Sequence, residues 1–63
     1  MKVREVLRLL RNDGWVLIRQ SGSHRQFQHT SKPGTVTVAG KPGDDLHPKT
    51  AASVLRQAGL RES

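Results

Sequence analysis

Histidine is the side chain of this sequence best suited to move a proton near neutral pH, and three histidines lie along the chain. His24 follows the small residues Ser21-Gly22-Ser23 and begins the segment HRQFQHT, which has the composition of a strand. A positioned general acid or base contributes about 10²–10⁴-fold to a reaction rate. His24 is therefore a candidate active-site residue, and the alternative is a polar residue where a strand meets solvent.

The other two histidines have structural explanations. We expect His29 on the helix-facing side of the sheet near Trp15, as a partly buried and hydrogen-bonded residue. His47 precedes Pro48 and is expected where the last helix begins. No two histidines have the spacing of a metal site and the chain has no cysteine, so we expect neither a metal nor another cofactor.

The charge balance favours a polyanionic partner. Eleven Lys and Arg residues oppose five Asp and Glu residues, which gives a net charge of +6. These basic residues are spread through the chain instead of lining one strongly amphipathic helix, so nucleic acid is favoured over a membrane surface. Trp15 and Phe27 are both assigned to the core, so no aromatic platform remains for stacking bases.

The length of the chain and its N-terminal residues bound its organisation. The 63 residues make one small domain, residues 1–63, with a limited core. Arginines interrupt the apolar residues at the N-terminus, and no segment approaches the roughly 20 apolar residues of a membrane span. We therefore expect a cytoplasmic protein.

Hydrophobic spacing predicts an α+β domain in the order α-β-β-β-α. Val3, Val6 and Leu10 recur at helical spacing, and Gly14 is suited to end that helix. The expected bounds are a helix at 3–12, strands at 15–20, 24–30 and 35–40, and a helix from Pro48 to Gly59. We expect a three-stranded antiparallel sheet with both helices on one face and the other face open.

Turns of three residues at 21–23 and four residues at 31–34 define a strand register. The register pairs Gln20 with His24, Leu17 with Phe27, Trp15 with His29, Phe27 with Val38, His29 with Val36, and Lys41 with His24. Side chains alternate across a strand. The helix-facing set is therefore Trp15, Leu17, Phe27, Val36 and Val38, and the open-face set is His24, Gln26 and Gln28.

The residues around His24 in this register suit a phosphate. An ammonium opposite an imidazole favours the neutral ring and can also hold an anion. We expect Lys41, Arg25 and Gln26 to bind a phosphate of a nucleic acid around His24.

Two other pairs of residues have a structural and a functional interpretation. Asp44-Asp45 has the composition of a paired-carboxylate site, but it lies just before the last helix, where we expect the carboxylates to cap the helix and complement its dipole. Val16 and Ile18 fall on the open face, either as part of a half-buried strand or as an apolar patch that a partner covers.

Four short segments, each weak on its own, occur together in this chain. They are Gly14-Trp15, Gly22-Ser23-His24 followed by Phe27, Pro42-Gly43 before the last helix, and LRQAGL at 55–60. In this order and at this length, from about Val3 to Leu60, the sequence resembles the HicA toxins of bacterial and archaeal toxin–antitoxin pairs.

The resemblance implies a fold, an activity and partners. HicA-like proteins have a double-stranded-RNA-binding-domain-like fold and are mRNA interferases, which cut RNA without a bound metal and stop translation. The catalytic histidine of the family corresponds to His24. A HicB antitoxin binds the toxin and covers this histidine, and the pair represses its own promoter through DNA contacts made mainly by the antitoxin.

This chain departs from the family at several positions. Ala39 and Lys41 stand where many relatives have a proline and a second histidine, and Arg25 stands where some have another histidine. Three functions are therefore weighed: a ribonuclease toxin with His24 catalytic, a non-catalytic RNA-binding module of the same fold, and an interaction protein whose open face binds a partner. The near-full-length resemblance favours the first.

Overall fold

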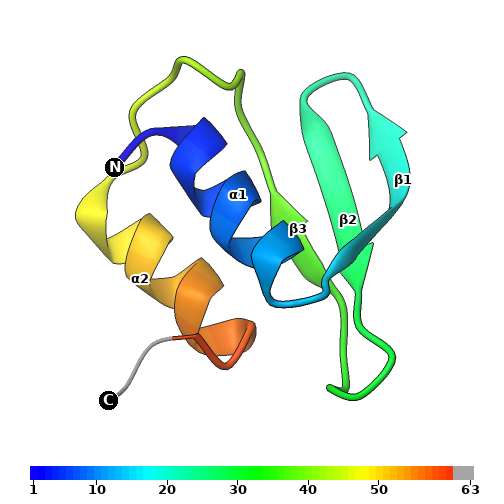
Figure 1. The fold of residues 1–63 in the computed structure, drawn as a ribbon. Helices are drawn as coiled ribbons and strands as arrows, with labels where there is room; N and C mark the ends of the chain where they lie inside the picture. Colours follow the sequence, from blue (N-terminus) through cyan, green and yellow to red (C-terminus); the bar gives the residue numbers. More distant parts are fainter. Residues whose placement is uncertain (61–63) are drawn as a thin grey trace.

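The order of helices and strands is the predicted one. The computed structural model describes residues 1–60. Along this part of the chain lie α1 (Val3–Asn12), β1 (Val16–Ser21), β2 (His24–Gln28), β3 (Val36–Val38) and α2 (Pro48–Gln57) (Figure 1). The strands form an antiparallel sheet in the order β1-β2-β3, which confirms the α+β prediction. Neither of these helices is long and apolar enough to cross a membrane.

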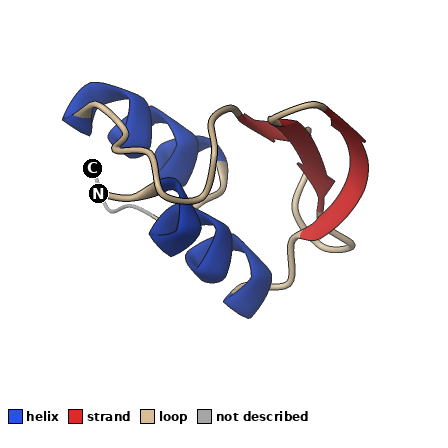
Figure 2. Cartoon of the chain, turned by 90° about the horizontal axis from the view of Figure 1, so that it is seen from above, coloured by secondary structure: helices blue, strands red, loops and turns tan. Residues whose placement is uncertain are grey.

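Both helices lie on one side of the sheet, as expected (Figure 2). α2 packs against α1 and against β3, at one edge of the sheet. The core lies between the helices and the sheet, and its least exposed side chains, at most 1% exposed, include Val3, Val6, Leu10, Phe27, Val36 and Val38. Phe27 is in the central strand, so its ring joins the apolar faces of the helices to the sheet.

β1 lies at the sheet edge farthest from the strand that α2 covers. Leu17 pairs with Phe27 as predicted, yet its side chain is 39% exposed. Leu17 therefore lies on its predicted face, but the expectation that the helices cover it is wrong, because they do not extend over this edge. Val16 and Ile18 are also exposed, so β1 presents three consecutive large apolar residues to solvent.

The register of the first hairpin differs slightly from the predicted one. Ser21 pairs with His24 across a two-residue turn at Gly22-Ser23, so the predicted pairing of Gln20 with His24 is wrong. The pairing changes register between Leu17 and Arg19, which leaves Ile18 as the extra residue of a β-bulge.

The second hairpin is shifted by two residues from the predicted register. Phe27 pairs with Val36 instead of Val38, and Arg25 pairs with Val38. β2 ends at Gln28, so residues 29–35 form a longer connection than the predicted turn. A shift by two residues leaves every side chain on its predicted face. The buried valines of β3 are accordingly those predicted.

The connection between β3 and α2 also caps the start of α1. The backbone N–H of Val3 donates to the Asp44 carbonyl (2.9 Å), and that of Arg4 donates to the Pro42 carbonyl (3.0 Å). These bonds satisfy donors that a helix leaves unpaired in its first turn. The Leu46 N–H donates in turn to the Met1 carbonyl at 2.8 Å, which fixes the connection against the N-terminus.

Asp44-Asp45 does not cap α2, so that prediction is wrong. The Asp44 carboxylate accepts the Lys41 backbone N–H (3.0 Å), and Asp45 pairs with the Lys2 ammonium at 3.1 Å. The N-cap of α2 is His47, whose Nδ1 accepts the Lys49 backbone N–H at 3.1 Å. The position predicted for His47 at the start of the helix is confirmed.

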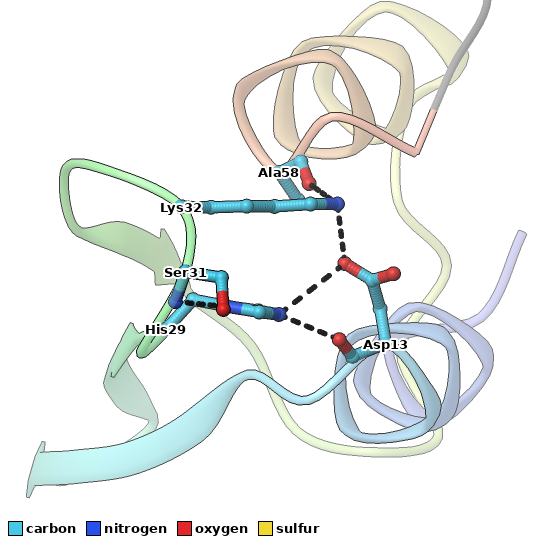
Figure 3. Close-up of polar contacts among 5 residues, drawn as sticks. All are labelled: Asp13, His29, Ser31, Lys32 and Ala58. Carbon is cyan, nitrogen blue, oxygen red and sulfur yellow. Dashed lines mark hydrogen bonds and ion pairs between the residues drawn. The ribbon is translucent and has the colours of Figure 1, made fainter.

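One cation joins the C-terminal ends of the two helices (Figure 3). Lys32 Nζ donates to the carboxylate of Asp13, the C-cap of α1 (2.5 Å), and to the carbonyl of Ala58, the C-cap of α2 (3.0 Å). A positive charge at the C-terminus of a helix interacts favourably with the helix dipole. Lys32 therefore holds both helices in place from the connection between β2 and β3.

His29 completes this cluster beside Lys32. Its Nδ1 accepts the Ser31 backbone N–H (2.9 Å), so its Nε2–H donates to the Asp13 carbonyl at 2.6 Å. The ring also makes an edge contact with Trp15, with ring centroids 5.3 Å apart. The prediction of a partly buried, hydrogen-bonded His29 near Trp15 is confirmed. These bonds hold His29 against α1 and explain why β2 ends at Gln28, two residues earlier than predicted.

The Asp13–Lys32 contact predicts a loss of stability in acid. The hydrogen bond from Lys32 holds the pKa of the Asp13 carboxyl below its ordinary value of 3.8. A lowered pKa in the folded state stabilises the protein above the unfolded pKa, and this contribution is lost as the pH falls through the folded pKa. We expect the free energy of unfolding to fall between about pH 5 and pH 2, with a smaller fall in Asp13→Asn.

Urea unfolding at several pH values, followed by the fluorescence of the single tryptophan, measures this effect. Asp45→Asn is the matched control, because the Asp45 side chain is 74% exposed and its pair with Lys2 lies at the surface. An Asp13→Asn variant with the pH dependence of the wild-type protein would contradict the prediction.

Candidate active site

His24 is the first residue of β2, directly after the Gly22-Ser23 turn. Gly22 has a φ of 59°, a conformation that favours glycine and supports so tight a turn. His24 is exposed, whereas Arg25 and Phe27 are buried at 9% and 0% exposure. Because side chains alternate along β2, His24 lies on the face away from the helices, as predicted.

Arg25 lies on the opposite side of β2 from His24 and holds the main chain beneath it. Its Nη1 donates to the Gly40 carbonyl (2.8 Å) and to the Ser23 carbonyl (3.4 Å). The Gly40 N–H donates to the same Ser23 carbonyl at 3.2 Å. This group of bonds fixes the turn before His24 to the end of β3. A contact of Arg25 with RNA beside His24 would require the guanidinium to leave both carbonyls.

Lys41 is not opposite His24, so this part of the predicted register is wrong. The pairing of Arg25 with Val38 places Ala39 across from His24 when it is continued by one residue. Gly40 then has a φ of 113°, and the chain leaves the sheet. Lys41 is exposed in the following turn, next to the residue that bonds Ser23. Lys41 therefore lies at the same end of the sheet as the His24 turn, but it is not paired with His24 on a neighbouring strand.

Gln26 occupies the centre of the open face. It pairs with Arg19 of β1 and Thr37 of β3, and it is half-buried. Together His24, Gln26 and Gln28 form a polar row along β2, and the Gln28 amide donates to the Thr35 hydroxyl at 3.3 Å. The row offers neutral donors and acceptors beside one imidazole.

A shallow hollow of about 390 Å³ lies at the other end of β2. Its lining residues are Val16, Ile18, Gln28, His29 and Thr30. His24 is absent from this lining, so the hollow is separate from the candidate catalytic residue. Its aliphatic wall is the exposed part of β1, and it is better suited to an apolar side chain than to a phosphate.

The chemistry open to this site is proton transfer by one accessible imidazole. Within residues 1–60 no side chain hydrogen-bonds the His24 ring, so no triad orients it. The same residues contain no group of three His, Cys, Asp or Glu side chains placed to hold a metal ion. A reaction that suits such a site is one in which the substrate supplies its own nucleophile.

The role of Arg25 in positioning the turn was missed from the sequence, although a signal was present. The alternation that places Phe27 in the core also places Arg25 on the same face. A buried arginine needs acceptors for its N–H groups, and carbonyls at neighbouring strand ends are available acceptors.

The family model described as the HicA toxin of bacterial toxin–antitoxin pairs matches residues 3–60. This match covers nearly all of the 63 residues. The chain belongs to the HicA toxin family. No curated protein matches it in a sequence comparison. The resemblance found in the sequence is thereby confirmed, and the protein is the toxin of a toxin–antitoxin pair.

Membership of the HicA family indicates, in general terms, what the protein does and what it binds. HicA toxins are ribonuclease-like, which implies an RNA substrate and an antitoxin partner in general terms. The catalytic role of His24 and the RNA contacts of Lys41, Gln26 and Arg25 in this HicA toxin stay predictions.

Replacing Arg25 by lysine is expected to loosen the His24 turn. Lysine keeps the charge, but its ammonium is one atom closer to the main chain than Nη1, which donates to both carbonyls, and it lacks the fixed plane of a guanidinium. The Ser23 carbonyl keeps its bond from the Gly40 N–H, but leaving the partly buried Gly40 carbonyl without a donor is expected to cost about 1–3 kcal/mol. Thermal unfolding measures the cost, and hydrogen exchange of the Gly40 amide, which bonds Ser23, reports the local loosening.

Arg19→Lys is the matched control, since Arg19 is exposed on the edge strand. If the Gly40 amide exchanges equally slowly in both variants and in the wild-type protein, Arg25 does not hold the turn.

Proposed function

We propose that this HicA toxin is a metal-independent mRNA interferase of the cytoplasm and that His24 is its proton-transfer residue. The observation that supports this most is the position of His24, an accessible imidazole at the edge of an open polar face. The net charge of +6 draws a polyanion to the protein.

The proposed reaction uses the 2′-hydroxyl of the RNA as nucleophile. This oxygen forms a bond to the adjacent phosphorus, and the bond from phosphorus to the 5′-oxygen of the next nucleotide breaks. The 2′-hydroxyl loses a proton, the departing 5′-oxygen gains one, and the products are a 2′,3′-cyclic phosphate and a 5′-hydroxyl. No activated water is needed, so the step runs without a metal-bound hydroxide.

His24 either removes the first proton or delivers the second. One such group supplies about 10²–10⁴-fold of rate, so a modest nuclease is expected. The Lys41 ammonium, in the turn next to Gly40, stabilises the charge on the phosphorane, and the Gln26 amide donates to a phosphate oxygen. Arg25 contributes by holding the turn, which revises its predicted role as an RNA contact.

The proposed active site predicts different effects for the same change at two exposed histidines. We expect His24→Asn to lower RNA cleavage in EDTA by at least about 100-fold. His47→Asn is the matched control, because asparagine is also a favoured N-cap and His47 caps α2. Cleavage of a labelled RNA by purified protein measures both.

The outcomes of this experiment separate the candidate functions. If the wild-type protein cuts RNA and His24→Asn cuts it equally well, His24 has no part in the mechanism. RNA binding without cleavage by any of the three proteins would favour the non-catalytic RNA-binding module.

A HicB-type antitoxin is the proposed protein partner. Family membership gives an antitoxin in general, and the open face offers a surface for it. Val16, Leu17 and Ile18 are 57%, 39% and 50% exposed on an edge strand that shares the sheet with His24. An antitoxin bound over this apolar strand and the polar row of β2 would cover His24. DNA is reached only through the antitoxin in this arrangement.

Ile18→Asp is expected to weaken antitoxin binding by at least about tenfold, or about 1.4 kcal/mol, while RNA cleavage is retained. A carboxylate in an apolar contact must be desolvated without a partner. Leu9→Asp is the control, because Leu9 is 36% exposed and belongs to α1 instead of the edge strand. Titration calorimetry with a HicB-type antitoxin measures the affinity. Equal losses in the two variants would argue against a contact at β1.

A further inference from the structure

Three arginines form one stripe along the exposed side of α1. Arg4, Arg8 and Arg11, here called the arginine stripe, are all exposed. At 3.6 residues per turn they fall within an arc of about 60°. The buried side chains of α1 lie on another part of the helix surface, so the stripe has no role in the core.

The carboxylates of residues 1–60 are engaged elsewhere. Glu5 accepts the backbone N–H of Lys2 (3.4 Å), and Asp13 binds Lys32. The Asp44 carboxylate accepts the backbone N–H of Lys41, and Asp45 pairs with Lys2. Within the described chain no ion pair therefore neutralises the arginine stripe.

The stripe opposes the stability of the helix that carries it. Arg4 lies in the first turn, where the helix dipole disfavours a positive charge. Arg4 and Arg8 are also four residues apart, so their like charges repel across one turn. Of the three arginines, Arg11 alone lies in the last turn, where the helix dipole favours a positive charge. A negatively charged partner outside the chain would reverse the repulsion.

Main-chain hydrogen bonds connect the helix that carries the stripe with the turn that precedes His24. The Arg4 N–H donates to Pro42 (3.0 Å), and the exposed Lys41 is the residue before it. The Gly40 N–H donates to Ser23 (3.2 Å), which directly precedes His24. Figure 1 shows this connection between β3 and α2 passing the N-terminal end of α1. The stripe, Lys41 and His24 thus follow one another around one end of the molecule.

We propose that the arginine stripe binds the sugar–phosphate backbone of the RNA substrate and leads the strand past Lys41 to His24. The proposal rests on the proposed ribonuclease function, whose site it extends. From Arg4 to Arg11 the helix rises about 10 Å, close to the length of three stacked nucleotides at about 3.4 Å each. Contacts to phosphates carry no sequence information. The stripe therefore contributes affinity and orientation, and the choice of the cut site is made elsewhere.

The test compares two variants that each lose two positive charges. Both are made in the His24→Asn protein, so that binding is measured without cleavage. R4Q/R8Q removes two of the three arginines of the stripe, and K49Q/R56Q removes two exposed cations of α2. The probe is a fluorescently labelled single-stranded RNA, and its anisotropy gives the affinity at several salt concentrations.

We expect R4Q/R8Q to lower the affinity by at least about tenfold at low salt, with the control much nearer the parent protein. The slope of log affinity against log salt should become shallower by about 1.4, because each phosphate contact of a single strand contributes about 0.7. The melting temperature of R4Q/R8Q should be equal to or higher than that of the parent.

Several results would overturn the proposal. Equal losses in the two variants would mean that net charge alone matters, and a lower melting temperature in R4Q/R8Q would give the stripe a structural role. Unchanged RNA binding with weaker antitoxin binding would assign the stripe to the protein partner. Failure of the proposed function has a different signature: the protein with His24 intact would not cut RNA, while R4Q/R8Q would still lower RNA affinity.

Discussion

The buried guanidinium of Arg25 is the contact on which the candidate site depends. It lies among the core side chains at 9% exposure, and it donates to carbonyls at the start of β2 and at the end of β3. Within residues 1–60 no carboxylate pairs with it, so neutral main-chain oxygens satisfy a charged group. Hydrogen bonds to a charged group are stronger than those between neutral groups. The His24 turn and the turn of Lys41 are therefore parts of one rigid corner.

The small size of the domain explains why so much of the sheet is open. Two helices of ten residues cover β3 and the centre of the sheet, and neither helix of residues 1–60 covers β1. Exposed edge strands are sites where another chain can pair. In most proteins such an edge is a liability, but for the toxin of a toxin–antitoxin pair it is a surface on which a partner can act.

The sequence predicted which face each strand residue occupies better than it predicted which residue pairs with which. Residues whose numbers differ by an even number lie on the same face of a strand. The two-residue shift of β3 therefore leaves each side chain on its predicted face. The register itself depends on His29, which leaves the ladder to bond Asp13 and so lengthens the connection. This long-range contact leaves no local pattern. Lys41 consequently lies beside the His24 turn and not across from it.

Helix caps and the grouping of surface charge were also poorly predicted from the sequence. Asp44-Asp45 had the right composition for a cap, but its carboxylate and carbonyl groups serve a turn and the start of α1, while His47 caps α2. The exposure of Leu17 depends on how far the helices reach, which no periodicity encodes. The basic residues seemed evenly spread along the chain. Only the helix geometry shows that three of them share one side of α1.

The capping of α1 by Pro42 and Asp44 also bears on the order in which the chain can fold during synthesis. The first turn of this N-terminal helix takes its hydrogen-bond acceptors from residues that the ribosome adds much later. Contacts between distant residues slow folding, because a long loop must close before they form. The first turn of α1, the turn of Lys41 and the turn before His24 therefore reach their final structure together. This happens only after the connection between β3 and α2 has been synthesised. A nascent toxin lacks its finished site until most of its length exists.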